Sequence, residues 1–152
     1  MSHLIFVFGT LKQGFPNFSR NQALRVAGEF VTLRRFPLYL VGERCSPWLV
    51  NSPGQGQQVT GQLFRADPIA LAHMDALERV AEADGYRRLA ITVVRLGDAL
   101  ASRLEALAYF KTPGQFKLAD ARHGPLAAYT AEHAALYRSR ALPQPAGMPV
   151  ST

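Results

Sequence analysis

The segment best suited to chemistry is the tetrad Phe8-Gly9-Thr10-Leu11, which begins where an apolar run at residues 4–8 stops. Such a run is typical of a strand buried on both faces. Gly9 has no Cβ, so a ligand can approach its backbone closely, and the N–H groups of Gly9, Thr10 and Leu11 are suited to binding an anion. An ordinary turn after a strand would have the same sequence. The tetrad is therefore a candidate anion-binding loop, with a simple turn as the alternative.

Glu78 is the candidate acid or base. With about 100° per residue, it projects between Leu71 and Met74, beside the apolar arc of a predicted central helix. Burial disfavours an ionised carboxylate and raises its pKa, which lets a glutamate accept and return a proton near neutral pH. Glu78 is therefore predicted to be a general base.

A structural role for Glu78 also stays open. It lies at the edge of the apolar arc, where Arg87 or Arg88 is available to pair with its charge. The same projection places Asp75 at the border with solvent and turns Arg79 away from the arc. Periodicity alone is compatible with either role.

These candidates must be positioned by the elements that the rest of the sequence predicts. Short apolar segments bounded by Gly, Pro or polar residues predict strands at 4–8, 25–33, 37–41, 48–50, 58–65, 88–96 and 103–111. Asp67 and Pro68 favour a helix start, and helical periodicity runs from 69 to 83. A second helix is predicted from 124 to about 140. The fold class is therefore α+β, with a small curved or barrel-like mixed sheet, one central helix and a C-terminal helix.

The 152 residues, 48% of them hydrophobic, suffice for one domain with its own core. We expect this single domain to occupy residues 1–141. Residues 142–152 contain three prolines and no apolar periodicity, so they are predicted to form a disordered tail. No motif indicates an oligomeric state.

The net charge of +6 raises the question of a nucleic-acid partner. The 17 basic residues are dispersed, and only Arg34-Arg35 and Arg87-Arg88 are adjacent. No basic helix face carries interleaved aromatic residues of the kind that single-strand binders use. We therefore expect no nucleic-acid partner.

Location and metal content follow from what the sequence contains. No apolar stretch reaches the roughly 20 residues of a membrane-spanning helix, and the start Met-Ser-His lacks the pattern of a secretory signal. The single cysteine, Cys45, suits a reducing compartment. The four histidines have no metal-ligand spacing. We therefore expect a cytoplasmic location, no membrane association and no metal.

Six short motifs, taken in order along residues 4–111, resemble those of a known family. The six motifs are Phe8-Gly9-Thr10-Leu11-Lys12 with Gly14-Phe15-Pro16-Asn17, Phe36-Pro37-Leu38 with Gly42-Glu43, Pro47-Trp48-Leu49, Pro53-Gly54-x-Gly56 with Val59-x-Gly61, Asp75-Ala76-Leu77-Glu78, and Tyr86-Arg87-Arg88. Together they resemble the γ-glutamylcyclotransferase-like superfamily, and most closely its γ-glutamylamine cyclotransferases. One departure is Phe8, which stands where the family usually has a tyrosine, so the hydrogen bond of that hydroxyl is missing.

The resemblance implies an intramolecular acyl transfer that needs no metal or organic cofactor. The α-amino group of a small-molecule γ-glutamyl substrate attacks its own γ-carbonyl, closes 5-oxoproline and expels an amine. Glu78 is implied as general base and then general acid, and the Phe8 to Leu11 loop is implied to bind the glutamyl moiety through its backbone. Tyr86 either orients the site through its hydroxyl or packs at the start of a strand.

Two alternatives remain at this point. The same ring closure could act on γ-glutamyl amino acids or another γ-glutamyl metabolite, or the fold could serve as a non-catalytic small-molecule-binding module. Residues 45–48 and the C-terminal third are expected to receive the leaving amine, and the resemblance is weakest in the C-terminal third.

Overall fold

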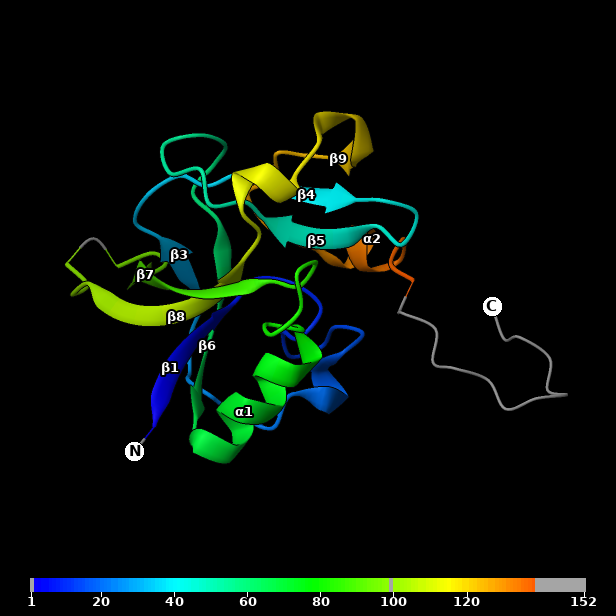
Figure 1. Cartoon of the computed structure of the whole chain (residues 1–152). Helices are drawn as coiled ribbons and strands as arrows, with labels where there is room; N and C mark the ends of the chain where they lie inside the picture. Colours follow the sequence, from blue (N-terminus) through cyan, green and yellow to red (C-terminus); the bar gives the residue numbers. More distant parts are fainter. Residues whose placement is uncertain (1, 99, 139–152) are drawn as a thin grey trace, which may run out of the picture.

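The computed structural model describes residues 2–98 and 100–138. Its central sheet contains β1 (His3–Val7), β2 (Leu24–Arg25), β3 (Phe30–Thr32), β6 (Thr60–Ala66), β7 (Arg87–Arg95) and β8 (Leu104–Phe110). The strand order is β1-β8-β7-β3-β6, and β6 also pairs with β1, so these five strands close into a barrel (Figure 1). β2 extends the sheet at β6. The pair of β1 and β8 is parallel and the other pairs are antiparallel, so the predicted mixed, barrel-like sheet is confirmed.

A second sheet lies beside the barrel and contains β4 (Leu38–Val41), β5 (Ser46–Leu49) and β9 (Ala121–His123) in the order β5-β4-β9 (Figure 1). Leu38, Leu40 and Leu49 from this sheet are completely buried and share one apolar cluster with Phe6 and Phe110 of the barrel. Burial of this apolar surface holds the two sheets together.

The helix α1 (Pro68–Leu77) packs against the barrel at the opposite side (Figure 1). Its start is as predicted, because the Asp67 carboxylate accepts a hydrogen bond from the N–H of Ala70 over 2.8 Å and Pro68 occupies the first turn. Its end is earlier than predicted. Arg79 has a left-handed backbone with φ 55°, which ends the helix well before residue 83.

The second predicted helix, from 124 to about 140, is wrong for most of its length. The structure has only the short α2 (Ala131–Ala134) there. The preceding residues are not helical. Leu126 donates its N–H to the carbonyl of Leu38, and the carbonyl of Ala127 accepts a hydrogen bond from the N–H of Thr60, over 2.8 Å each. These bonds to distant strands replace the helical pattern. The predicted tail at 142–152 lies outside the described residues.

The strand predicted at 25–33 is interrupted. It divides into β2 and β3, and the break includes Gly28, which has φ 104°. The remaining elements are three short 3-10 helices, η1 (Phe18–Arg20), η2 (Pro113–Gln115) and η3 (Leu118–Asp120). Within the described ranges, no helix has the length and apolar character needed to cross a membrane.

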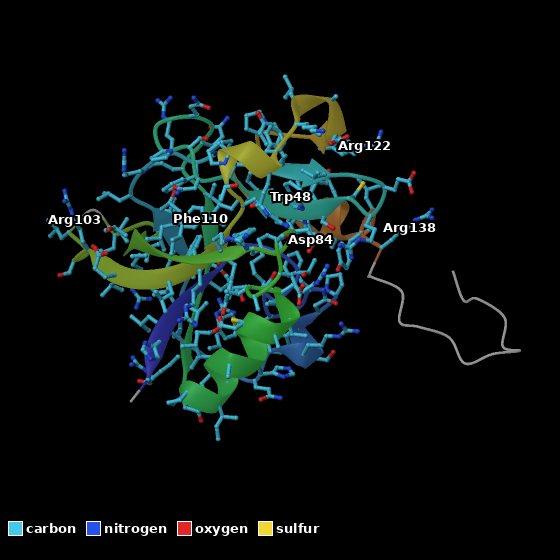
Figure 2. All side chains as sticks on the ribbon, in the orientation of Figure 1. Trp48, Asp84, Arg103, Phe110, Arg122 and Arg138 are labelled. Atoms are coloured by element: carbon cyan, nitrogen blue, oxygen red, sulfur yellow. The ribbon has the colours of Figure 1, made fainter. Side chains whose placement is uncertain are left out.

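In Figure 2, Arg103 lies at one edge of the molecule and Arg122 and Arg138 lie toward the opposite edge, whereas Trp48 and Asp84 lie near the middle of the view and line the same cavity. That cavity lies where the second sheet, the end of β1 and the segment after α1 meet.

Candidate active site

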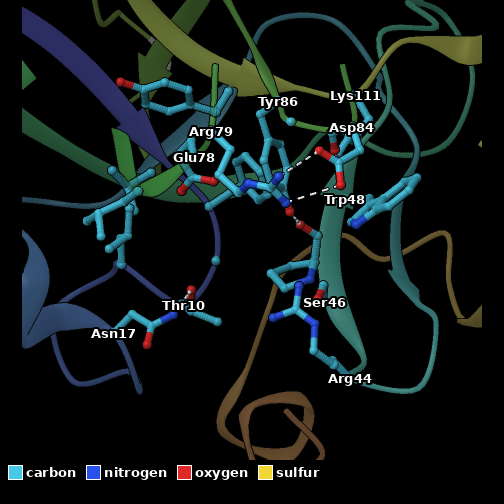
Figure 3. Close-up of a pocket in the computed structure, with 18 of the residues that line it drawn as sticks. Thr10, Asn17, Arg44, Ser46, Trp48, Glu78, Arg79, Asp84, Tyr86 and Lys111 are labelled. Atoms are coloured by element: carbon cyan, nitrogen blue, oxygen red, sulfur yellow. Dashed lines mark hydrogen bonds and ion pairs between the residues drawn. The ribbon is translucent and has the colours of Figure 1, made fainter. Parts of the chain in front are cut away.

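The cavity has a volume of about 760 Å³ and brings together all six residues that the sequence predicted for a site (Figure 3). Phe8, Gly9, Thr10 and Leu11 follow β1, Glu78 follows α1, and Tyr86 immediately precedes β7. Further side chains that the sequence did not single out for the site are Asn17, Arg20, Arg44, Arg79, Asp84, Lys111 and Tyr137.

The loop after β1 forms part of the wall of this cavity. Its carbonyl groups are engaged, because Gly9 accepts from the N–H of Lys12 over 3.0 Å and Thr10 accepts from the N–H of Asn17 over 2.8 Å. The N–H groups of Gly9, Thr10 and Leu11 donate to no atom of the described residues. Three consecutive donors held in a fixed loop form a site suited to an anion such as a carboxylate.

Gly9 is required at its position by the neighbouring sheet. A Cβ there would lie 2.7 Å from Cγ of Pro47, closer than real Cβ contacts allow. The loop and β5 can therefore approach each other only with glycine at this position.

Glu78 is the residue that caps the C-terminal end of α1, where its N–H donates to the carbonyl of Met74 over 3.0 Å. The side chain is half-buried and lines the cavity. Burial raises the pKa of Glu78 to about 7, and the positive charge of Lys111 opposes this rise. A carboxyl group with this pKa exchanges a proton readily at neutral pH.

The pairing of Glu78 with Arg87 or Arg88, which the sequence left open, does not occur. Arg88 pairs with Asp75, and Arg87 donates to backbone carbonyls that include those of Glu82 and Gly85. Asp75 is also the acceptor for the hydroxyl of Tyr109 over 2.6 Å. Asp75 is thus fully engaged, while the Glu78 carboxylate accepts no hydrogen bond from the part of the chain that the structure describes.

The second acid of the cavity, Asp84, forms an ion pair with Arg79, which the helical projection had predicted to point away from the apolar arc. Arg79 does not point away but lines the cavity, because the helix has already ended and the backbone of Arg79 is left-handed. Its guanidinium forms an ion pair with Asp84 over 3.1 Å (Figure 3). Of the two acids that line the cavity, Glu78 is therefore the one without an ion pair among the described residues.

Tyr86 connects the segment after α1 to the second sheet. Its hydroxyl donates a hydrogen bond to the carbonyl of Pro47 over 2.8 Å (Figure 3). Burial raises the pKa of Tyr86 well above its ordinary value, and the charge of Glu78 raises it further. The phenol therefore stays protonated and keeps its role as donor, in addition to packing at the start of β7.

Lys111, which immediately follows β8, contacts both the second sheet and the segment after α1. Its Nζ lies 4.4 Å from the ring centroids of both Trp48 and Tyr86 and donates to the carbonyl of Asp84 over 2.5 Å. The sequence signal for it was weak, since it is only the polar residue that follows a predicted apolar strand. Its importance follows from contacts with residues far away in the chain.

The C-terminal third contributes to the cavity as expected. Asn17 Nδ2 donates to the Thr10 hydroxyl over 3.0 Å and to the Tyr137 hydroxyl over 3.1 Å, so it joins the loop after β1 to the C-terminal segment. The N–H of Arg138 donates to the carbonyl of Arg44 over 2.9 Å. Within the described ranges, no group of three or more His, Cys, Asp or Glu residues is placed to hold a metal ion.

Comparison with known proteins agrees with the motif order. Residues 5–139 match the family described as gamma-glutamyl cyclotransferase, AIG2-like. Gamma-glutamylaminecyclotransferase B of Danio rerio is 37% identical over 115 residues, which cover 72% of this chain and 59% of that protein. The gamma-glutamylaminecyclotransferase of Mus musculus is 38% identical over 98 residues, which cover 61% of this chain and 64% of that protein. The chain thus spans about three fifths of the length of these curated relatives.

A solved structure is similar over nearly the whole described domain. The crystal structure of an AIG2-like protein from Mus musculus has a TM-score of 0.78 and 29% sequence identity, and the alignment covers 91% of this chain and 97% of that one. The resemblance predicted from the sequence motifs is therefore confirmed, and so is the fold class.

Proposed function

Because the chain belongs to the gamma-glutamyl cyclotransferase, AIG2-like family, we propose that it closes a γ-glutamyl unit to 5-oxoproline and releases the amine that the unit carries. One observation carries this proposal. A single cavity holds a carboxylate that is free of protein partners, Glu78, together with three backbone donors that are equally free, at Gly9, Thr10 and Leu11.

In the proposed binding mode, the α-carboxylate of the substrate accepts hydrogen bonds from the N–H groups of Gly9, Thr10 and Leu11. The γ-glutamyl chain is flexible, and holding it folded brings the α-amino group to its own γ-carbonyl, which removes an entropic part of the barrier. Backbone groups make these contacts, so the presence of Phe8 in place of the family's usual tyrosine leaves them intact.

Glu78 is the proposed proton shuttle. It takes one proton from the α-ammonium group and passes it to solvent, and the neutral nitrogen then attacks the γ-carbonyl carbon and forms the new C–N bond. As this bond forms, Glu78 takes the second proton that the nitrogen must lose. Glu78 returns this second proton to the leaving nitrogen as the original amide bond breaks, so that neutral 5-oxoproline and the amine leave and the carboxylate is regenerated. Its pKa of about 7 suits both steps, because it lies close to the value of about 8 that is ordinary for an α-amino group.

Tyr86 is proposed to position rather than to react. Its hydroxyl is committed to the Pro47 carbonyl and stays protonated. It therefore holds β5 against the segment that carries Glu78, which keeps the proton shuttle and the loop at Gly9 on opposite walls of one cavity.

The test is 5-oxoproline release from γ-glutamyl-ε-lysine and simple γ-glutamyl alkylamides. Glu78→Gln should lower kcat by about 10²–10⁴. Glu82→Gln is the matched control, because Glu82 follows the same helix but is exposed and outside the cavity, and we expect its kcat to stay within about twofold of wild type. If the folded wild-type protein released no 5-oxoproline yet bound it, a binding module would replace the enzyme as the function.

A further inference from the structure

More basic than acidic residues line the cavity. It is lined by the basic residues Arg20, Arg44, Arg79 and Lys111 and by the acids Glu78 and Asp84. Arg79 forms an ion pair with Asp84. Lys111 donates a hydrogen bond to the carbonyl of Asp84, and its positive charge lowers the pKa of Glu78. Arg20 and Arg44 have no acidic partner among the residues that the structure describes.

The two unpaired arginines differ in their surroundings. Arg20 is exposed, whereas Arg44 is half-buried and immediately precedes the left-handed Cys45 and β5. The carbonyl of Arg44 is held by the N–H of Arg138. In Figure 3 the guanidinium of Arg44 points from its backbone toward Ser46 and the Tyr86 hydroxyl, into the cavity. A half-buried guanidinium has lost part of its hydration, and an anion in the cavity would compensate for that loss.

Arg44 and Glu78 line the same cavity as Tyr86 (Figure 3). Burial is the main reason that the pKa of Tyr86 is raised, the charge of Glu78 adds to the rise and the charge of Arg44 opposes it. Both charges are therefore near the Tyr86 side chain. A group attached to a nitrogen at Glu78 thus shares one cavity of about 760 Å³ with Arg44.

On the basis of the proposed function, two parts of the substrate remain for Arg44. The α-carboxylate is assigned to the N–H groups of the loop at Gly9 and the α-ammonium to Glu78, which leaves the γ-carbonyl oxygen and the substituent of the departing nitrogen. Of these two, only the substituent can carry a full negative charge in the bound substrate. We infer that Arg44 determines specificity by pairing with a carboxylate on the leaving amine, so that γ-glutamyl derivatives of amino acids are preferred over those of neutral amines.

The test uses substrate pairs that differ only in charge. Wild-type kcat/KM is measured for γ-glutamyl-glycine, γ-glutamyl-4-aminobutyrate and γ-glutamyl-6-aminohexanoate, and for the primary amide of each. At one or more of these lengths we expect the acid to be preferred over its amide by about 10- to 100-fold, as for a charge-assisted pair. Arg44→Gln should reduce that preference to about threefold or less, and Arg44→Lys should retain part of it.

Arg20→Gln is the matched control, because it removes the same charge from the exposed rim of the same cavity. We expect it to change the acid-to-amide preference by less than about twofold. An equal effect of Arg20→Gln and Arg44→Gln would indicate that the overall positive charge of the cavity, and not a direct ion pair with Arg44, sets the preference for the acid. That result would overturn the inference. So would the absence of a preference at every length, a preference that survives Arg44→Gln, or an equal loss for acid and amide, which would assign Arg44 to the glutamyl carboxylate instead.

Failure of the proposed function is detected separately. The same acid and amide pairs are titrated by calorimetry into Glu78→Gln and into Glu78→Gln combined with Arg44→Gln, which measures binding whether or not turnover occurs. Tighter binding of the acid that depends on Arg44 supports the inference even if wild type releases no 5-oxoproline. Equal binding of acid and amide, or no binding of either, overturns it.

Discussion

The N–H of Tyr86 donates a hydrogen bond to the carbonyl of Glu78 over 3.0 Å. The segment between them therefore forms a closed loop, and both of its ends lie at the cavity. Arg79 begins this loop in a left-handed conformation and Gly85 closes it. The placement of the glutamate relative to the tyrosine thus depends on how residues 79–85 pack against themselves.

Gly85→Ala should disrupt this loop. A Cβ at residue 85 would lie 1.7 Å from the carbonyl oxygen of Arg79, so the backbone must shift. We expect a loss of about 2–4 kcal/mol in the free energy of unfolding, measured by urea denaturation, and a fall in activity at temperatures where the variant is still folded. Gly114→Ala is the control, because the atom nearest to a Cβ there is 4.0 Å away, and unchanged stability of both variants would contradict the prediction.

Lys111→Met should shift the pH dependence of catalysis. The charge of Lys111 lowers the pKa of Glu78 against the larger effect of burial, so its removal should raise that pKa above about 7. Glu78 must be ionised to act as base, and the acid limb of kcat/KM against pH should therefore move to higher pH. The exposed Lys117→Met is the control. If the acid limb of kcat/KM stays at the same pH in a folded Lys111→Met protein, a group other than Glu78 determines that limb.

Glu78→Gln should increase stability at alkaline pH while it lowers kcat by about 10²–10⁴. The pKa of Glu78 is raised from 4.5 to about 7 in the folded protein. Stability from this group is therefore fully present below pH 4.5 and is lost as the pH rises through 7. At pH 8.5 we expect the variant to exceed wild type by about 1–2 kcal/mol, after allowance for partial exposure, relative to their difference at low pH. Urea unfolding at both pH values, with Glu82→Gln as control, tests this, and a pH-independent difference would contradict it.

Asn17→Ala should loosen the loop that we propose binds the substrate carboxylate. The substitution removes the hydrogen bonds to the Thr10 and Tyr137 hydroxyls but keeps the backbone bond between residues 17 and 10. We expect KM to rise by about tenfold, more than kcat falls, because the variant retains Glu78 and loses support for glutamyl binding. Tyr137→Phe removes one of the two bonds and should have a smaller effect in the same direction. A larger effect on kcat than on KM in Asn17→Ala would assign Asn17 to the chemical step.

Features encoded by neighbouring residues could be predicted from the sequence. The end of the first strand at Gly9 and the start of the helix at Asp67 and Pro68 depend on local steric and capping preferences, which the structure bears out. The ordered motifs also predicted the family, because they include the backbone turns and side chains that meet at one cavity. The proton-shuttle role of Glu78 remains a prediction.

Features that depend on distant contacts required the tertiary structure. The helical projection was correct at Leu71 and Met74, which are buried, but wrong at Arg79, because the loop closed by Tyr86 ends the helix early. The pairing of β1 with β8, the contact of Lys111 with Trp48 and the bonds of Leu126 to the second sheet join residues far apart in the chain. The sequence by itself therefore determined the family, the local elements and the candidate residues. Only the tertiary structure decided that Glu78 has no ion pair within the described residues and that the charge of Lys111 acts on it, because these two residues come from separate elements.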